Sequence, residues 1–273
     1  MMKILGHINL ENFPTKKPAF NFEKYQDLLS NRLSFLADKV NNEFGPIVDS
    51  GGSVKFSDGH DLNLIKIQEE TWAKEQSLSR EDWLRKKEKN KGEMTEKAIT
   101  LLLDEILGED FLVVRASSFD DYNNGVDNVI LDKRTGNVVC GFDDVISRDK
   151  DDGSEKKNEK IKRIMSRGGA KLKYGLNFKE GGGLETKELK NLPAFYLALS
   201  KDDLALALES LEKGRPDEGV DKLAIKLFNS IDKQIKDIDR ENLDNNLFFN
   251  INEFEHSFFN IKKRFLKSED KGI

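Results

Sequence analysis

The segment 111–145 places carboxylates within a β-strand pattern, and this limits what the chain can fold into. Three short apolar runs cover residues 111–114, 126–131 and 138–142. The first gap between them ends in Asn-Asn-Gly and the second contains Thr-Gly-Asn, and both sequences favour the turns of antiparallel hairpins. The pattern therefore predicts a three-strand antiparallel meander.

Carboxylates stand at the ends of two of these predicted strands. Asp143 and Asp144 close the third run, whose two faces are both apolar or small, so the pair lies at the edge of a covered sheet. Asp127 opens the second run and reaches the same place if the strands pair in register. Carboxylates crowded into a partly buried place need a cation or a proton, and oxygen-only ligands favour Mg²⁺ or Mn²⁺ over zinc.

The charges of the chain are unevenly distributed. It has 273 residues and a formal net charge of −5. Residues 119–155 contain ten acids against four bases, and residues 156–173 contain eight bases against one acid. Either run alone is better explained as a solvated charged face. Together, an acidic pocket and a basic strip suit a metal-dependent enzyme that acts on a phosphate polymer.

The composition excludes several other kinds of site. Cys140 is the one cysteine, so an internal disulfide and a cysteine-rich metal site are excluded, and its apolar surroundings indicate a buried structural thiol. The three histidines, His7, His60 and His256, are scattered and support neither a zinc site nor a triad. The sequence has no phosphate-binding glycine loop, no signal-peptide core and no apolar run of membrane-spanning length. We expect a cytoplasmic protein without a membrane partner.

The chain before the meander has a helical pattern. Helices are predicted over residues 23–40 and 61–89. Trp72 and Trp83 are eleven residues apart and would lie on one helical face, where packing against the core is favoured over base stacking.

A further helix is predicted over residues 93–107. Its apolar side chains recur with helical spacing, and Glu96 falls on the same face, toward the core. Two explanations stay open: Glu96 belongs to a functional site, or it is a first-turn acid that stabilises the helix dipole.

Helices follow the meander, with one more strand between them. A short helical stripe lies in the basic segment, and Ser200 is a helix N-cap. The predicted elements are a strand over 192–199 and helices over 201–213, 217–240 and 246–266.

Together these elements predict an α/β (α+β) fold. We expect a central mixed four-stranded sheet with a three-strand meander, flanked by helices and extended by helical additions at both ends. The expected division is a mostly helical region over residues 1–92, a core over 93–213 and C-terminal helices over 214–273.

The core resembles the PD-(D/E)XK nuclease-like superfamily. The likeness consists of the order helix, three strands, helix, strand, of Glu96 on the first helix, and of Gly125-Val126-Asp127 opening the second strand. It implies that Asp127 is the metal-binding aspartate and that Glu96 is the glutamate that many members place on this helix. The second acid would be Asp143 or Asp144.

Two features of the resemblance depend on details of the third strand. Asp143 is preferred over Asp144 if it shares the site-facing side with Gly141. The motif's lysine is missing, since Val145 follows two residues after Asp143. Some members are thought to supply this lysine from the next helix, and Lys160 or Lys162 are the candidates.

The resemblance implies a Mg²⁺- or Mn²⁺-dependent nuclease that hydrolyses phosphodiesters. The expected partner is nucleic acid, with DNA preferred over RNA, and a homodimer is compatible with the fold. Two alternatives stay open: a non-catalytic scaffold that binds a protein or nucleic acid, and a metal-dependent enzyme acting on a small phosphorylated substrate. The side chains expected to hold the nucleic-acid backbone are Arg163, Arg167, Lys171 and Lys173.

Overall fold

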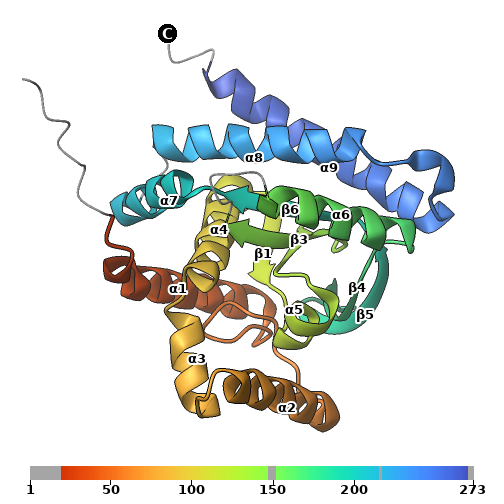
Figure 1. The fold of residues 1–273 in the computed structure, drawn as a ribbon. Helices are drawn as coiled ribbons and strands as arrows, with labels where there is room; N and C mark the ends of the chain where they lie inside the picture. Colours follow the sequence, from red (N-terminus) through yellow and green to blue (C-terminus); the bar gives the residue numbers. More distant parts are fainter. Residues whose placement is uncertain (1–19, 147–151, 215–216, 270–273) are drawn as a thin grey trace, which may run out of the picture.

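A mixed four-stranded sheet lies at the centre of the computed structural model, which describes residues 20–146, 152–214 and 217–269 (Figure 1). The strand order is β1-β2-β3-β6, in which the first three strands are antiparallel neighbours and β6 runs parallel to β3. This arrangement confirms the predicted fold class. The strands are β1 (Phe111–Arg115), β2 (Asn128–Asp132), β3 (Val138–Ile146) and β6 (Ala194–Leu199).

Two helices, α4 (Lys91–Leu107) and α6 (Asp152–Ser166), cover opposite faces of this sheet. Successive side chains of a strand point to opposite faces, and the two carboxylates of β3 separate in this way. Asp143 pairs with lysines of α6, whereas the side chain of Asp144 lies on the side of α4. The adjacent acids therefore belong to different environments.

The C-terminal helices pack on the same core. Helix α7 (Lys201–Lys213) begins as predicted at Ser200, which forms a reciprocal capping box with Asp203. Helix α8 (Glu218–Lys236) ends before the position predicted for it, and a short 3-10 turn η2 (Arg240–Asn242) leads into α9 (Asn245–Glu269). Helix α9 reaches the sheet, where the rings of Phe195 and Phe254 stack with centroids 4.7 Å apart.

One contiguous cluster of buried apolar side chains runs through the described parts of the chain. It includes Leu33 near the N-terminus, Phe142 and Phe195 in the sheet, and Phe254 in α9. The cluster thus contains residues from all three predicted regions, and the boundaries between those regions stay a prediction. Among the described residues no helix is long and apolar enough to cross a membrane.

The N-terminal region differs from the prediction in one break. A 3-10 turn η1 (Glu23–Tyr25) leads into α1 (Gln26–Phe44), but the helix predicted over 61–89 is two helices, α2 (Gly59–Glu75) and α3 (Arg80–Glu88). Ser77 has a positive φ of 57° and Ser79 caps α3, so the chain turns sharply between them. We call α2 and α3 the arm; Figure 1 shows it in orange at one end of the molecule.

The break between α2 and α3 also determines where the two tryptophans lie. Trp72 lies on α2 and Trp83 on α3, so the prediction that they share one helical face is wrong. Their ring centroids are nevertheless 5.6 Å apart because the arm folds back on itself, and Trp83 is buried. This contact fits the prediction that the two rings pack within the protein and are not exposed for stacking on nucleic-acid bases.

The connection between β1 and β2 is a helix and not the predicted turn. Helix α5 (Ser118–Asn124) is capped by Ser117, whose hydroxyl accepts a hydrogen bond from the Asp120 backbone N–H. It ends at Gly125, which has the left-handed φ of 64° that favours glycine. The Asn-Asn-Gly sequence therefore ends a helix instead of forming a hairpin turn.

A two-stranded hairpin between α6 and β6 was also not predicted. Strands β4 (Ala170–Phe178) and β5 (Leu184–Leu192) are antiparallel and form a sheet of their own. The strand predicted over 192–199 thus begins at Ala194, after the end of this hairpin. In β4, buried Leu172 alternates with exposed Lys171 and Lys173, a period-two pattern that indicates a half-buried strand.

Asp120 holds α5 against this hairpin. Its carboxylate is fully buried and accepts hydrogen bonds from the backbone N–H groups of Lys173 and Tyr174 at 2.7 and 3.0 Å. Asn124 and Ser117 of the α5 segment donate to the same carboxylate, each at 2.7 Å. One side chain therefore fixes the position of α5 relative to β4.

We expect Asp120→Ala to destabilise the protein by about 3 kcal/mol, because it removes a buried carboxylate that accepts four hydrogen bonds and leaves the backbone N–H groups of Lys173 and Tyr174 without this acceptor. Urea denaturation followed by circular dichroism measures this free energy of unfolding. Asp38→Ala, an exposed position on α1, is the matched control and should change it by less than about 0.5 kcal/mol. Equal, small effects of the two substitutions would contradict the assigned role of Asp120.

Candidate metal centre

Three carboxylates from three elements converge beside the sheet. Glu96 comes from α4, Asp121 from α5 and Asp127 from the residue before β2, and one oxygen of each lies within 4.8 Å of the others. Two of the three were predicted from the sequence. Asp121 was not predicted because its segment was expected to be a turn. The signals that could have revealed a helix are Ser117, a residue type that caps helix N-termini, and Gly125, a residue type that ends helices, with seven residues between them.

The backbone of Asp127 is fixed between two strands. Its N–H donates to the Phe142 carbonyl at 2.7 Å, and its own carbonyl accepts from Ala116 at 2.8 Å. Its side chain is fixed as well, since Oδ2 accepts from the Asp144 backbone N–H at 2.5 Å. Asp127 is therefore held rigidly at the edge of the sheet.

Asp143 of β3 lies near Asp127, since burial and nearby acids, Asp143 among them, raise the pKa of Asp127. The register of β2 and β3 begins at the pair Asn128–Phe142, and the Asp127 backbone N–H just before it donates to the Phe142 carbonyl. Gly141 and Asp143 point to one side of β3, and a Cβ on Gly141 would meet the side chain of Val126. The preference for Asp143 over Asp144 stays a prediction.

Asp144 occupies a buried position on the other face. Its Oδ2 accepts a hydrogen bond from the Asn128 amide, whose oxygen in turn accepts from the Thr100 hydroxyl at 2.6 Å. Its Oδ1 is buried and has no hydrogen-bond partner among the described residues. Neither Asp143 nor Asp144 belongs to the close group formed by Glu96, Asp121 and Asp127.

Two cations lie among the carboxylates. Arg115 contacts Glu93 at 2.8 Å and Glu96 at 3.1 Å. Lys87 of the arm lies 3.8 Å from Glu93 and 3.7 Å from Asp121. We call the four acids Glu93, Glu96, Asp121 and Asp127 the acidic cluster; among the described residues, its ion pairs are with these two cations.

Burial and mutual repulsion raise the pKa of most of these acids. Burial, with Glu93 nearby, raises the pKa of Glu96 to about 7. Burial and the neighbouring charges of Glu96 and Asp121 raise the pKa of Asp127 well above its ordinary value. The pKa of Asp144 is raised well above its ordinary value too, first by burial and then by Asp127.

Glu93 behaves differently from its neighbours. Burial opposes its ionisation, but Arg115 and Lys87 outweigh burial and lower its pKa. The cluster therefore has one carboxylate that stays charged because of its cations, and others whose charge is poorly compensated. A group of oxygen donors in this state fits a divalent cation of the Mg²⁺ or Mn²⁺ type.

The lysines of α6 divide between two sides of the helix. Lys157 and Lys160 both form ion pairs with Asp143, so Lys160 reaches the predicted neighbourhood and Lys157 joins it unpredicted. Lys160 also lies against Gly125, where any Cβ would collide with its ammonium. Lys162 does not contact Asp143 in the described structure.

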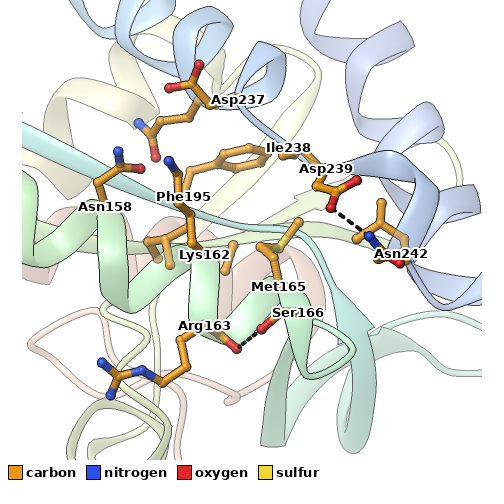
Figure 2. Close-up of a pocket in the computed structure, with 14 residues that line it drawn as sticks. Asn158, Lys162, Arg163, Met165, Ser166, Phe195, Asp237, Ile238, Asp239 and Asn242 are labelled. Carbon is orange, nitrogen blue, oxygen red and sulfur yellow. Dashed lines mark hydrogen bonds between the residues drawn. The ribbon is translucent and has the colours of Figure 1, made fainter.

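Lys162 instead lines a cleft between α6, β6 and the end of α8. The cleft has a volume of about 510 Å³ and an apolar floor that includes Met165 and Phe195. Figure 2 shows Lys162 and Asn158 of α6 beside it, facing Asp237 and Ile238. No residue of the acidic cluster lines this cleft, so it is separate from the candidate metal centre.

The four basic residues expected to hold nucleic acid are not equivalent. Arg163, Arg167 and Lys171 are exposed. Lys173 is exposed too, but it forms an ion pair with the buried Asp61 at 2.5 Å and lies 5.0 Å from the centre of the Phe119 ring. It therefore already joins β4 to the arm.

We expect the metal-free protein to lose stability as the pH rises from about 4.5 to about 7. In this window the folded protein retains a proton on Glu96 that the unfolded chain releases, because the folded-state pKa is raised from 4.5 to about 7. Urea denaturation in chelator at about pH 5 and about pH 8 should show a fall of about 2 kcal/mol from this group. Glu96→Gln should remove this part of the dependence, leaving the part that comes from other acids with raised pKa such as Asp127; a variant as pH-dependent as the wild type would contradict the raised pKa of Glu96.

In comparisons with models of protein families, with characterised proteins and with solved structures, no significant match to this chain was found. The fold and the site are therefore interpreted from the chain's own residues. The resemblance to the PD-(D/E)XK superfamily stays a prediction.

Proposed function

We propose that the protein is a metal-dependent nuclease that hydrolyses phosphodiester bonds of nucleic acid. The observation that carries this proposal is the meeting of two groups at one edge of the sheet. One is the acidic cluster around Asp127, and the other is Asp143 with Lys157 and Lys160, close enough for the charge of Asp143 to act on Asp127. A cation site beside a pair of ammonium groups suits a substrate that carries phosphate.

The residues that would hold the cation are Glu96, Asp121 and Asp127. Their donor atoms are all carboxylate oxygens, which suits Mg²⁺ or Mn²⁺. A divalent cation at this position would lower the pKa of a bound water and offset charge that develops on the phosphate. None of these three ligands is a histidine or a cysteine, so zinc is disfavoured.

Two lysines share a single carboxylate and leave one positive charge for the substrate. Lys157 and Lys160 both pair with Asp143, and the Lys160 side chain is 40% exposed. Lys160 would contact a phosphate oxygen or orient the attacking water. Arg163, Arg167 and Lys171 would hold the nucleic-acid backbone without reading bases. DNA as the preferred substrate, a homodimer and a cytoplasmic location remain predictions.

The topology supports the same proposal. Helix α4, strands β1 to β3, helix α6 and strand β6 follow the order of the resemblance, and β6 is parallel to β3. Helix α5 and the hairpin of β4 and β5 are additions to that order. Because a fold alone does not determine activity, the proposal depends on the site.

A non-catalytic scaffold is the second candidate. It is favoured by exposed apolar side chains on the arm and on α9, which could bind a partner. A scaffold without a metal site should gain no thermal stability from millimolar Mg²⁺ or Mn²⁺, whereas a cation bound only by the folded state stabilises it. The exposed apolar side chains that favour the scaffold are Leu62 and Ile67 on the arm and Phe249 and Phe259 on α9.

We expect Asp127→Ala to reduce metal-dependent cleavage to the level seen in chelator, because the variant removes the rigidly held ligand. The measurement is cleavage of labelled single- and double-stranded DNA and RNA with Mn²⁺, Mg²⁺ or chelator. Asp38→Ala should cleave like the wild type. Full activity in Asp127→Ala would refute the site.

The two sides of α6 provide a further test. We expect Lys160→Ala to lower the cleavage rate about a hundredfold, because it removes an ammonium next to Asp143, whereas Lys162→Ala should leave the rate unchanged. Both substitutions remove one positive charge from the same helix, so a general loss of attraction for nucleic acid affects them alike. Equal losses in both variants would show that Lys160 acts only through that attraction.

A further inference from the structure

The arm supplies a cation to the acidic cluster from outside the sheet. Lys87 of α3 lies 3.7 Å from Asp121 and 3.8 Å from Glu93, and its side chain is only 24% exposed. Its ammonium also donates to the Tyr122 hydroxyl at 3.2 Å and lies 4.5 Å from the centre of that ring. Lys87 is therefore enclosed by the cluster and is not a solvated surface lysine.

A chain of contacts holds Lys87 in this place. Tyr122 donates its hydroxyl proton to Glu69 of α2 at 3.1 Å. Glu69 is buried and receives the Arg80 side chain through two nitrogens, at 2.6 and 2.7 Å. Because Arg80 begins α3, these bonds fix the arm's two helices relative to each other and to α5.

The second cation comes from the sheet itself. Arg115 ends β1 and contacts Glu93 and Glu96, and its side chain is 13% exposed. The four carboxylates of the acidic cluster are thus balanced by two cations. If all are ionised, two negative charges remain. Lys97 pairs with Glu88. Asp143 and Asp144 add two negative charges and Lys157 and Lys160 two positive ones, so counting these neighbours leaves the same two negative charges.

A separate observation is a buried polar atom without a partner beside the cluster. Asp144 lies directly after Asp143, and its backbone N–H binds Asp127. Its carboxyl is buried, yet Oδ1 has no hydrogen-bond partner among the described residues. A buried polar atom in this state costs free energy unless a water, a proton or a cation satisfies it.

We propose that Lys87 and Arg115 are internal counter-cations that limit the acidic cluster to a single divalent cation. The two remaining negative charges match one such ion, and a second would meet a cluster that is already neutral. The proposal rests on the cation site of the proposed function and adds its stoichiometry. It also makes cation binding depend on the arm, because the arm carries Lys87.

The test is calorimetric titration of the full-length, nucleic-acid-free protein with Mn²⁺. We expect one ion per wild-type chain. Lys87→Met should bind Mn²⁺ on the order of tenfold more tightly or take up a second ion, because it removes a competing charge. Glu93→Gln, which removes a negative charge, should bind about tenfold more weakly. The double variant restores the net charge, so its affinity and stoichiometry should return to those of the wild type.

Two controls separate charge from position. Lys86→Met removes a neighbouring lysine that pairs with Gln76, away from the cluster, and should bind Mn²⁺ like the wild type. Lys87→Arg keeps the charge and should do the same. If Lys87→Met does not fold, Glu93→Gln and the double variant still test the proposal, because they alter the same charge balance.

Three results would overturn the proposal: two ions bound by the wild type, weaker binding by Lys87→Met, or a double variant that does not return to wild-type behaviour. Weaker binding by Lys87→Met would show that Lys87 positions Asp121 instead of competing with the ion. Failure of the nuclease proposal is seen separately. One bound ion with the expected order of variants but no cleavage would sustain the counter-cations and refute the nuclease.

Discussion

Repulsion between carboxylates at the edge of the sheet is the constraint on which much of this structure depends. Four acids from α4, α5 and the start of β2 are close together where water is scarce, and two cations only partly offset them. The cost appears in the raised pKa of Glu96 and Asp127. The surrounding contacts resist separation of the acids, as the bonds that fix Asp127 to both neighbouring strands show.

The alternation of strand side chains assigns adjacent acids to different tasks. Asp143 faces the lysines of α6, whereas Asp144 is buried on the α4 side with Asn128. A shift of β3 by one residue would exchange these environments. The pairing of β3 with both β2 and β6 prevents such a shift and therefore determines which acid faces the lysines of α6.

Two additions to the core determine where α5 lies. The hairpin binds it through Asp120, and the arm binds it through Tyr122 and Lys87. A helix of seven residues has little stability of its own, because forming its first turn fixes several residues for few hydrogen bonds. The position of Asp121, and with it the third side of the candidate metal centre, is consequently a property of the whole assembly.

The sequence by itself determined the sheet, most of the helices and two of the three close carboxylates. Alternating apolar runs indicate strands, and the helical spacing of α4 turns Glu96 toward the core, so Glu96 and Asp127 could be found from local pattern alone. Only the tertiary structure placed Asp121, Lys87 and Lys157 beside the candidate metal centre. Their roles depend on contacts between segments far apart in the chain, including a short helix that looked like a turn and a lysine-rich strand that looked like a charged surface. Local periodicity records which face of an element is buried, but it does not record which other element covers that face.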